Sequence, residues 1–180
     1  MHRQELMRFL AAGTVALLFA ACGAATEGIP PEALVVSARD AYVEARSVAR
    51  SWDGAARLRY VEGEGVAATG VVAPEEGIWR FHYTALDRPQ ELVVEVSALE
   101  TASAERPETS PPGYVIGDNA LGASWIDSRE VVEAIAAAGT APAGPLSLLL
   151  VPTRPAQWVV RSAGDGRWRV HAETGELLSP

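Results

Sequence analysis

Two histidines, His82 and His171, are the side chains best suited to chemistry in this sequence. Each lies two positions after an arginine, Arg80 or Arg169, so in a strand the histidine and the arginine would share one face. Neutral imidazole is a good zinc ligand, and two histidines brought together could bind a metal ion or an anion. Two ligands leave a zinc site incomplete, so the alternative is a solvated strand face whose histidines and arginines pair with neighbouring acids. His82 and His171 are therefore candidate metal ligands.

Motifs for other kinds of catalysis are missing from the sequence. It contains no His-Glu-x-x-His, Cys-x-x-Cys or Gly-x-Ser-x-Gly pattern. Gly63 and Gly65 are expected in a hairpin turn and lack the following helix that a phosphate-binding loop needs. We therefore expect a protein that is not an enzyme and has no cofactor. The alternative is an envelope hydrolase or metal-dependent enzyme that uses His82 and His171.

Cys22 is the only cysteine, so no internal disulfide can form. It follows Arg3, Arg8 and an uncharged, mostly apolar run over residues 9–21. This run is too short for a membrane-spanning helix, which takes about 20 residues, but it suits the apolar core of a secretory signal. The alternative is a buried thiol in an ordinary N-terminal helix.

Residues 18–23, which read Leu-Phe-Ala-Ala-Cys-Gly, resemble a bacterial lipobox. Phe19 departs from it, because an aliphatic residue is commoner there. The resemblance implies that residues 1–21 are a lipoprotein signal peptide. It also implies that acylated Cys22, carrying palmitate or a similar chain, anchors the protein to a lipid membrane. Because Gly23 is not Asp, resemblance to Gram-negative sorting favours the outer membrane, facing the periplasm or the cell surface.

The composition excludes some functions without selecting one. The formal net charge is −8 and the sequence pI is about 4.9, so the phosphate backbone of a nucleic acid would repel the chain. Of the 180 residues, 48% are hydrophobic and 21% are charged, which favours a folded core over wholesale disorder. We expect no nucleic-acid partner.

The chain before residue 99 has the pattern of one helix followed by four strands. Residues 30–32 (Pro-Pro-Glu) favour a helix start and Gly54 a helix end. Between them, apolar residues recur at spacings of four and three, which predicts an amphipathic helix over 34–52. Turn residues such as 62–65 separate the strand-like runs. These runs are 56–61, 66–73, 78–85 and 91–98.

The second half repeats this order after residues 99–113, which show no periodicity and predict a loop. Asp127 and Glu130 suit a capping box for a helix over 127–138. Strand-like runs follow at 146–151, 157–162 and 167–172. The predicted parts are the signal peptide 1–21, a tether 22–31, a helix-plus-meander repeat 32–98, a linker or loop 99–124 and a second repeat 125–180.

The two halves also match in sequence. Residues 79–82 (Trp-Arg-Phe-His) align with 168–171 (Trp-Arg-Val-His), and the same offset places helix 34–52 over helix 127–138. A short sequence match within the same order of helices and strands indicates duplication. The alternative is two hairpins that are alike by chance.

The second half resembles a PepSY module. Residues 125–130 read Trp-Ile-Asp-Ser-Arg-Glu, and residues 171–177 read His-Ala-Glu-Thr-Gly-Glu-Leu, close to the Asp-Ala-x-Thr-Gly-Glu-Val kind that ends such modules. The resemblance covers about residues 125–178, and the first half joins it only through the repeat. It implies an α+β fold of two α-β-β-β(-β) units, each a helix packed on a small antiparallel sheet in a PepSY-like or cystatin-like arrangement. It also implies an envelope protein that binds or restrains partners, a protease among them, and it supplies no catalytic residues.

The five tryptophans fall mostly on the strand face that should pack against the helices. Trp125 and Trp158 are the exceptions that we expect to be partly exposed, and an exposed tryptophan is a natural anchor for a partner. The run 91–98 alternates poorly and could be a sheet edge that accepts a partner strand. We therefore expect a non-catalytic lipoprotein of the cell envelope that binds a protein or peptide.

Overall fold

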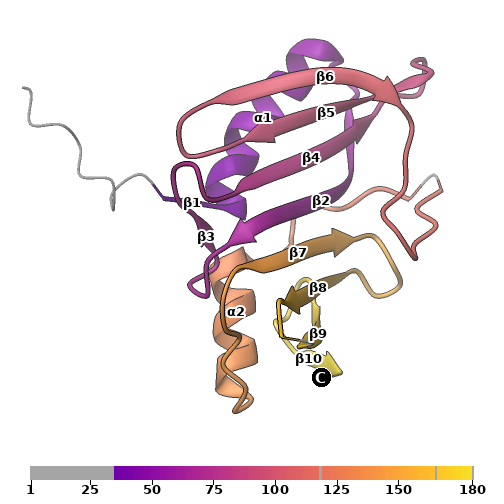
Figure 1. Cartoon of the computed structure of the whole chain (residues 1–180). Coiled ribbons are helices and arrows are strands. Elements are labelled where there is room, and N and C mark those ends of the chain that lie inside the picture. The colour runs from indigo at the N-terminus through magenta and orange to yellow at the C-terminus, as the bar shows by residue number, and fades with distance from the viewer. Residues whose placement is uncertain (1–34, 118, 165, 180) are drawn as a thin grey trace, which may run out of the picture.

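Strands β2 (Arg57–Val66) and β7 (Leu146–Val151) pair at the centre of an eight-stranded antiparallel sheet. The computed structural model describes residues 35–117, 119–164 and 166–179. The strand order is β10-β9-β8-β7-β2-β4-β5-β6 (Figure 1). The other strands are β4 (Ile78–Thr84), β5 (Gln90–Val96), β6 (Thr101–Pro107), β8 (Gln157–Ser162), β9 (Arg167–His171) and β10 (Leu177–Ser179). The predicted α+β class is what the structure has, but the strands form one large sheet instead of two small ones.

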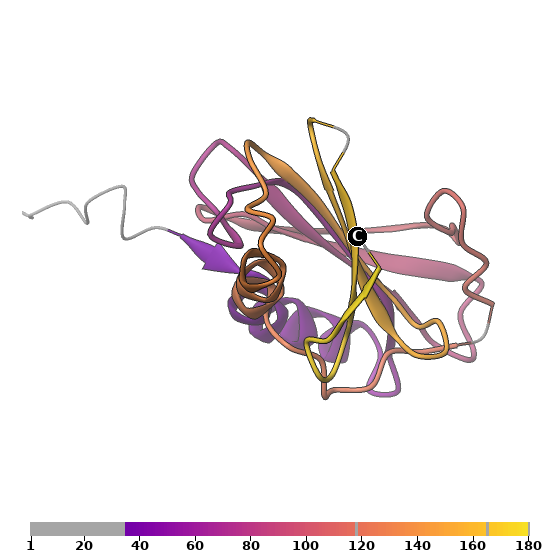
Figure 2. The same ribbon diagram turned by 90° about the horizontal axis from the view of Figure 1, so that it is seen from below.

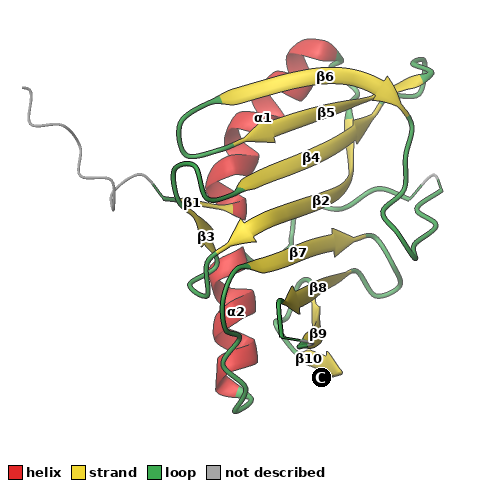
Figure 3. Ribbon diagram, viewed as in Figure 1, coloured by secondary structure: helices red, strands yellow, loops and turns green. Residues whose placement is uncertain are grey.

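Helices α1 (Ala38–Trp52) and α2 (Ser128–Ala137) cover one face of this sheet (Figures 2 and 3). Helix α1 buries only alanines completely, at positions 38, 41, 45 and 49, so its backbone can lie close to the strands. The strand residues beneath it are large, and Trp79 and Phe81 are fully buried. Small residues on the helix and aromatic residues on the sheet therefore fill this layer together.

The start of α1 differs from the prediction of a helix over 34–52. Val36–Ser37 forms the short strand β1, which pairs with β3 (Val71–Val72). Ser37 is the N-cap, and its hydroxyl accepts from the amide of Asp40 while the Asp40 carboxylate accepts from Ser37 in return. This Ser-x-x-Asp capping box is visible in the sequence, and it ends the preceding extended backbone.

The predicted turn at 62–65 is wrong, because β2 continues through it to Val66. Gly63 is inside the strand, where a Cβ would lie 2.3 Å from the Trp79 ring. The glycine makes room for this indole and does not mark a turn. The predicted strand 66–73 is reduced to β3, and Glu62 lies within β2 and not at a turn tip.

The predicted linker also contains a strand. Residues 101–107 form β6, which pairs with β5 over seven positions and makes β6 the edge of the sheet. The run 91–98, expected as a possible edge, corresponds to β5 and lies between β4 and β6. Every residue of β6 is exposed, so its sequence has no alternation of buried and exposed positions to reveal the strand.

The sheet also changes the alignment of the two halves. Beside the central pair, β4 flanks β2 and β8 flanks β7. Trp79 of β4 therefore occupies the place that Trp158 of β8 occupies in the other half, whereas the sequence alignment matched Trp79 to Trp168 of β9. The two fully buried indoles meet edge to face, with centroids 6.5 Å apart. The halves share this core.

The segment after β6 wraps around the ends of the central strands. Thr109 and Ile116 contact the sheet face opposite the helices, which we call the outer face. The amide of Leu121 then donates to the Leu58 carbonyl, and Trp125 packs on the helix side. The segment thus links the two faces.

In the part of the chain that the structure describes, no helix is long and apolar enough to cross a membrane.

Candidate functional site

His82 and His171 do not share a site. His82 is on β4 and His171 at the end of β9, with β2, β7 and β8 between those strands. Four strand spacings correspond to about 19 Å, so one metal ion cannot be ligated by both side chains. The Nδ1 of His171 accepts from the amides of Glu173 and Thr174, at 3.2 and 3.3 Å, and orders the turn before β10.

Trp125 and Trp158 are not exposed anchors. They are 3% and 0% exposed and meet edge to face, with ring centroids 5.8 Å apart. The Arg39 guanidinium lies over the Trp125 ring, 3.9 Å from its centroid, and donates to the Trp125 carbonyl. Both tryptophans belong to the core. Cys22, the predicted signal peptide and the predicted tether lie outside the described residues.

A buried polar cluster occupies the outer face of β2, β4 and β5. It consists of Arg59, Glu91 and His82, which are 3%, 1% and 5% exposed. Arg59 Nη1 lies 3.0 Å from the Glu91 carboxylate, and His82 Nδ1 lies 3.3 Å from its other oxygen. The His82 ring stacks on Tyr60 with centroids 3.9 Å apart. Buried charges of this kind are stable only when each has partners.

A bulge in β2 brings Arg59 into this cluster. Leu58 is opposite Tyr83 and Tyr60 is opposite His82, so Arg59 is the extra residue between two paired positions. A bulge breaks the alternation of strand faces and re-aims a side chain. The sequence therefore gave no sign that Arg59 would join the outer face with Tyr60.

The cluster fastens the segment that follows β6. Thr109 Oγ1 donates to Glu91 at 2.7 Å, and its carbonyl accepts from Arg59 Nη1 at 2.9 Å. The Tyr60 hydroxyl is 3.0 Å from Thr109 Oγ1, and the Glu108 carboxylate is 3.1 Å from Arg59. The charges thus hold residues 108–117 against the sheet.

A small apolar cluster lies beside these charges. Ile116 from the loop packs with Tyr60, Val151 and Val159, and Tyr114 lies at its margin. The outer face is therefore partly covered, and His82 is enclosed beneath the cover. Polar and apolar contacts secure the same segment.

The ionisation of this cluster follows from burial and partners. Burial disfavours the charged His82 ring, but hydrogen bonds to Glu62 and Glu91 outweigh it, so the pKa of His82 is raised. Burial also opposes ionised Glu91, yet bonds from His82 and Thr109 prevail and its pKa is lowered. Burial raises the pKa of Tyr60 to about 12. The arrangement favours a charged imidazole between two carboxylates, because His82 Nε2 is 3.4 Å from Glu62.

The sequence singled out His82 but not its partners. Glu91 lies next to Leu92 in a largely buried strand, and Thr109 lies beyond β6, so only the paired sheet brings them to His82. The distance in sequence between Glu62 and His82 does not predict their contact, because neighbours on adjacent strands are set by the strand register.

Comparisons with known proteins support the fold alone. No protein-family model matches the chain, and no curated protein matches its sequence. A solved structure described as a "putative lipoprotein" from Clostridium difficile 630 is similar, with a TM-score of 0.50 and 12% identity. The similarity covers 77% of this chain and 90% of that chain. The α+β architecture therefore has a structural relative, whereas the PepSY resemblance has no matching family model.

Proposed function

We propose that the chain is a non-catalytic cell-envelope lipoprotein that binds an extended segment of a protein or peptide partner along β6. The observation that carries this proposal is the edge itself. Residues 101–107 are all exposed, and they pair on one side only, with β5. An edge strand presents unpaired N–H and C=O groups, which are a template for another strand.

The composition of β6 suits strand addition. Residues 101–104 are Thr-Ala-Ser-Ala, which carry neither charge nor proline and are small enough for a second backbone to approach. Proline and charge, two common means of protecting an edge, occur only at the far end, at Glu105, Arg106 and Pro107. The opposite edge, β10, has three residues and offers a shorter template.

The absence of catalysis in this proposal is supported by the roles of the two histidines. His82 is enclosed between Glu62 and Glu91 beneath the loop, and His171 accepts from backbone amides. Each side chain therefore has a structural role: His82 pairs with buried carboxylates, and His171 stabilises a turn.

Lipid attachment in this proposal is supported by residues 18–23 and by the fold similarity to a protein described as a lipoprotein. Cys22→Ser removes the acylation site, so the chain should lose its lipid and leave the membrane fraction of cells. Metabolic labelling with palmitate and fractionation measure both effects. Unchanged labelling and membrane attachment would show that Cys22 is not the anchor. Placement in the outer membrane is the narrower form of this proposal.

Photo-crosslinking tests the edge. A photoreactive residue at Ala104 in intact cells should capture one defined partner segment, whereas the same residue at Val43, exposed on α1, should not. The double variant A102K/A104K places two charges beside the edge and should abolish capture by a photoreactive residue at Ser103 without loss of fold. Equal adducts at Ala104 and Val43, or capture that survives the lysines, would contradict the proposal.

A narrower form names the partner as a protease that the chain restrains, and it rests on the PepSY resemblance. The captured partner should then have peptidase activity that falls when the intact chain is added. A partner without such activity would leave strand addition standing and remove this narrower form.

A further inference from the structure

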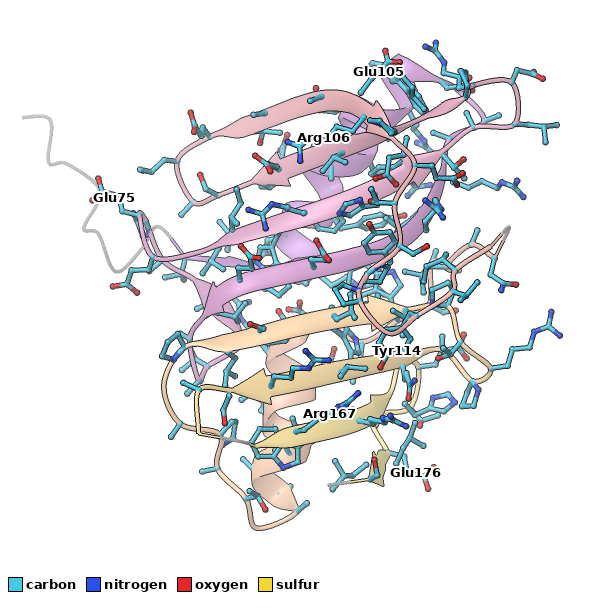
Figure 4. The ribbon with its side chains drawn as sticks, turned by 45° about the vertical axis from the view of Figure 1, so that its right-hand side comes forward. Glu75, Glu105, Arg106, Tyr114, Arg167 and Glu176 are labelled. Atoms are coloured by element: carbon cyan, nitrogen blue, oxygen red, sulfur yellow. The ribbon has the colours of Figure 1, made fainter. Side chains whose placement is uncertain are left out.

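A basic patch lies on the outer face at the other end of the sheet. Arg161 on β8 is directly opposite Arg167 on β9, and Arg169 follows two residues later on the same face. All three side chains are exposed. Figure 4 shows Arg167 on the face that also carries the Tyr114 loop. We call Arg161, Arg167 and Arg169 the arginine patch.

The arginine patch contrasts with the same face of the first half. There, Arg80 lies 2.7 Å from Glu64 and 2.9 Å from Glu95, and Arg106 lies 3.6 Å from Glu95. Within residues 35–117, 119–164 and 166–179, no ion pair joins any member of the patch to a carboxylate. Asp165 lies outside those residues, and its single negative charge is smaller than the charge of three guanidinium groups.

Such an arrangement is unfavourable for folding alone. Like charges directly opposite each other on a sheet repel, and side chains paired in this way lie about 5 Å apart. The chain as a whole carries a formal net charge of −8, so carboxylates to neutralise the patch are plentiful in its composition. In the described residues no ion pair offsets the repulsion between these arginines, and this points to an anionic ligand from outside the chain.

We propose that the arginine patch binds the anionic phospholipid headgroups of the membrane in which the chain is anchored. Guanidinium groups bind phosphate oxygens in a bidentate manner, and three of them on a sheet face can contact several headgroups of a planar surface. The proposal rests on the lipid anchor proposed above. Residues 23–34 separate Cys22 from the first described residue, and twelve residues reach at most about 40 Å, which keeps the sheet near the headgroups.

The geometry also predicts an orientation. If β8 and β9 face the membrane, Glu64 on β2 is two strand positions from β8, Glu95 on β5 is four positions from β8, and β6 is six positions from β9. Six spacings correspond to about 29 Å, so the edge proposed for the partner stays accessible.

A fluorescence experiment on the lipidated full chain tests this inference. Once Cys22 is acylated, Ser147→Cys introduces a single thiol for a fluorophore on β7, in the same row as Arg161. The labelled chain is reconstituted in vesicles of phosphatidylcholine alone or with phosphatidylglycerol, each with a headgroup-attached quencher. We expect several-fold stronger quenching with phosphatidylglycerol, reduced by high salt. A label at Ser51→Cys, exposed on α1, should show no such difference.

Charge variants complete the test. R161Q/R167Q/R169Q should lower the quenching in phosphatidylglycerol vesicles to its value in phosphatidylcholine. R46Q/R50Q/R57Q removes three exposed arginines elsewhere and should leave it high. If the patch variant quenches as strongly as wild type, or lipid composition has no effect, headgroup binding is wrong and an acidic protein segment becomes the ligand to examine.

Vesicle flotation distinguishes a failure of headgroup binding from a failure of the lipid anchor. A chain that floats with both vesicles but shows no composition-dependent quenching retains the anchor and refutes the patch. A chain that floats with neither refutes both.

Discussion

Trp79 and Trp158 make the same hydrogen bond in the two halves of the sheet. The Nε1 of Trp79 donates to the Val36 carbonyl at 3.0 Å, and that of Trp158 donates to the Ile126 carbonyl at 3.2 Å. Val36 and Ile126 each immediately precede a helix N-cap. Each indole therefore fixes the entry of one helix onto the strand that flanks the centre of the sheet.

Removing either indole should destabilise the whole fold. Trp79→Ala and Trp158→Ala each leave a large cavity in one shared core, and we expect each to lower the free energy of unfolding by about 3–5 kcal/mol. Trp79→Phe and Trp158→Phe retain most of the ring but lose the bond to the helix entry. They should cost less than the alanine variants, and denaturant unfolding measures the difference. A single cooperative transition is expected, and two separate transitions would contradict a shared core.

Gly63→Ala should be destabilising although alanine suits a strand better than glycine does. The added Cβ would lie 2.3 Å from the Trp79 ring, so the indole must shift, at about 1–3 kcal/mol. Gly54→Ala is the matched control, since nothing lies within 4 Å of its Cβ. In a Trp79→Leu background, Gly63→Ala should cost much less. An equal cost in both backgrounds would show that another contact is responsible.

Ser128→Ala should weaken the junction between the helices. The Ser128 hydroxyl is fully buried, donates to the Gly70 carbonyl at 2.6 Å and accepts from the Ala38 amide at 2.9 Å. Its loss leaves two buried backbone groups without this partner, so we expect about 1–3 kcal/mol of destabilisation in urea unfolding. Ser51→Ala, on the exposed face of α1, should change stability little. A cost at Ser51 equal to that at Ser128 would contradict the assignment.

The stability should depend on pH through His82 and Glu91. Because the folded pKa of His82 is raised above the usual 6.5, its contribution is complete below that pH and is lost as the pH rises through the folded value. Because the folded pKa of Glu91 is lowered, its contribution is complete above 4.5 and is lost as the pH falls through the folded value. This pair therefore contributes most between these limits.

Urea unfolding across a pH series checks this expectation. His82→Gln should remove the decline of stability on the alkaline side of 6.5. Arg57→Gln, at the exposed start of β2, controls for the introduced amide. Wild-type and His82→Gln curves that run parallel across the series would contradict the role given to His82.

The sequence predicted elements well wherever one face is buried. Strands β7 and β8 have the predicted bounds, because each is a largely apolar run next to turn residues, Gly144, Pro145 and Pro152 around β7 and Gly164 after β8. The sequence pattern does not reveal β6, because this strand is exposed on both faces. It also predicts a turn at Gly63, where the glycine instead makes room for the Trp79 ring inside β2. Apolar spacing alone places the start of α1 too early, whereas the capping box of Ser37 and Asp40 marks where the helix begins.

The candidate site was less accessible to sequence reasoning. His82 could be singled out, but its partners come from a bulge at Arg59, a neighbouring strand at Glu91 and a segment that crosses the sheet at Thr109. Each depends on register or on a loop path, which alternation does not encode. The exposure expected for Trp158 was wrong for a related reason, since a residue at a strand start is buried when a preceding loop covers it.

The pairing of β2 with β7 affects how the chain folds. Val61 is opposite Leu150, so the central pairing closes a loop of almost half the sequence. Until β7 emerges from a ribosome or a secretion channel, one side of β2 has no partner strand. Long-range pairing of this kind is slow and leaves intermediates prone to aggregation. The nascent first half would therefore depend on a holding chaperone until its complement arrives.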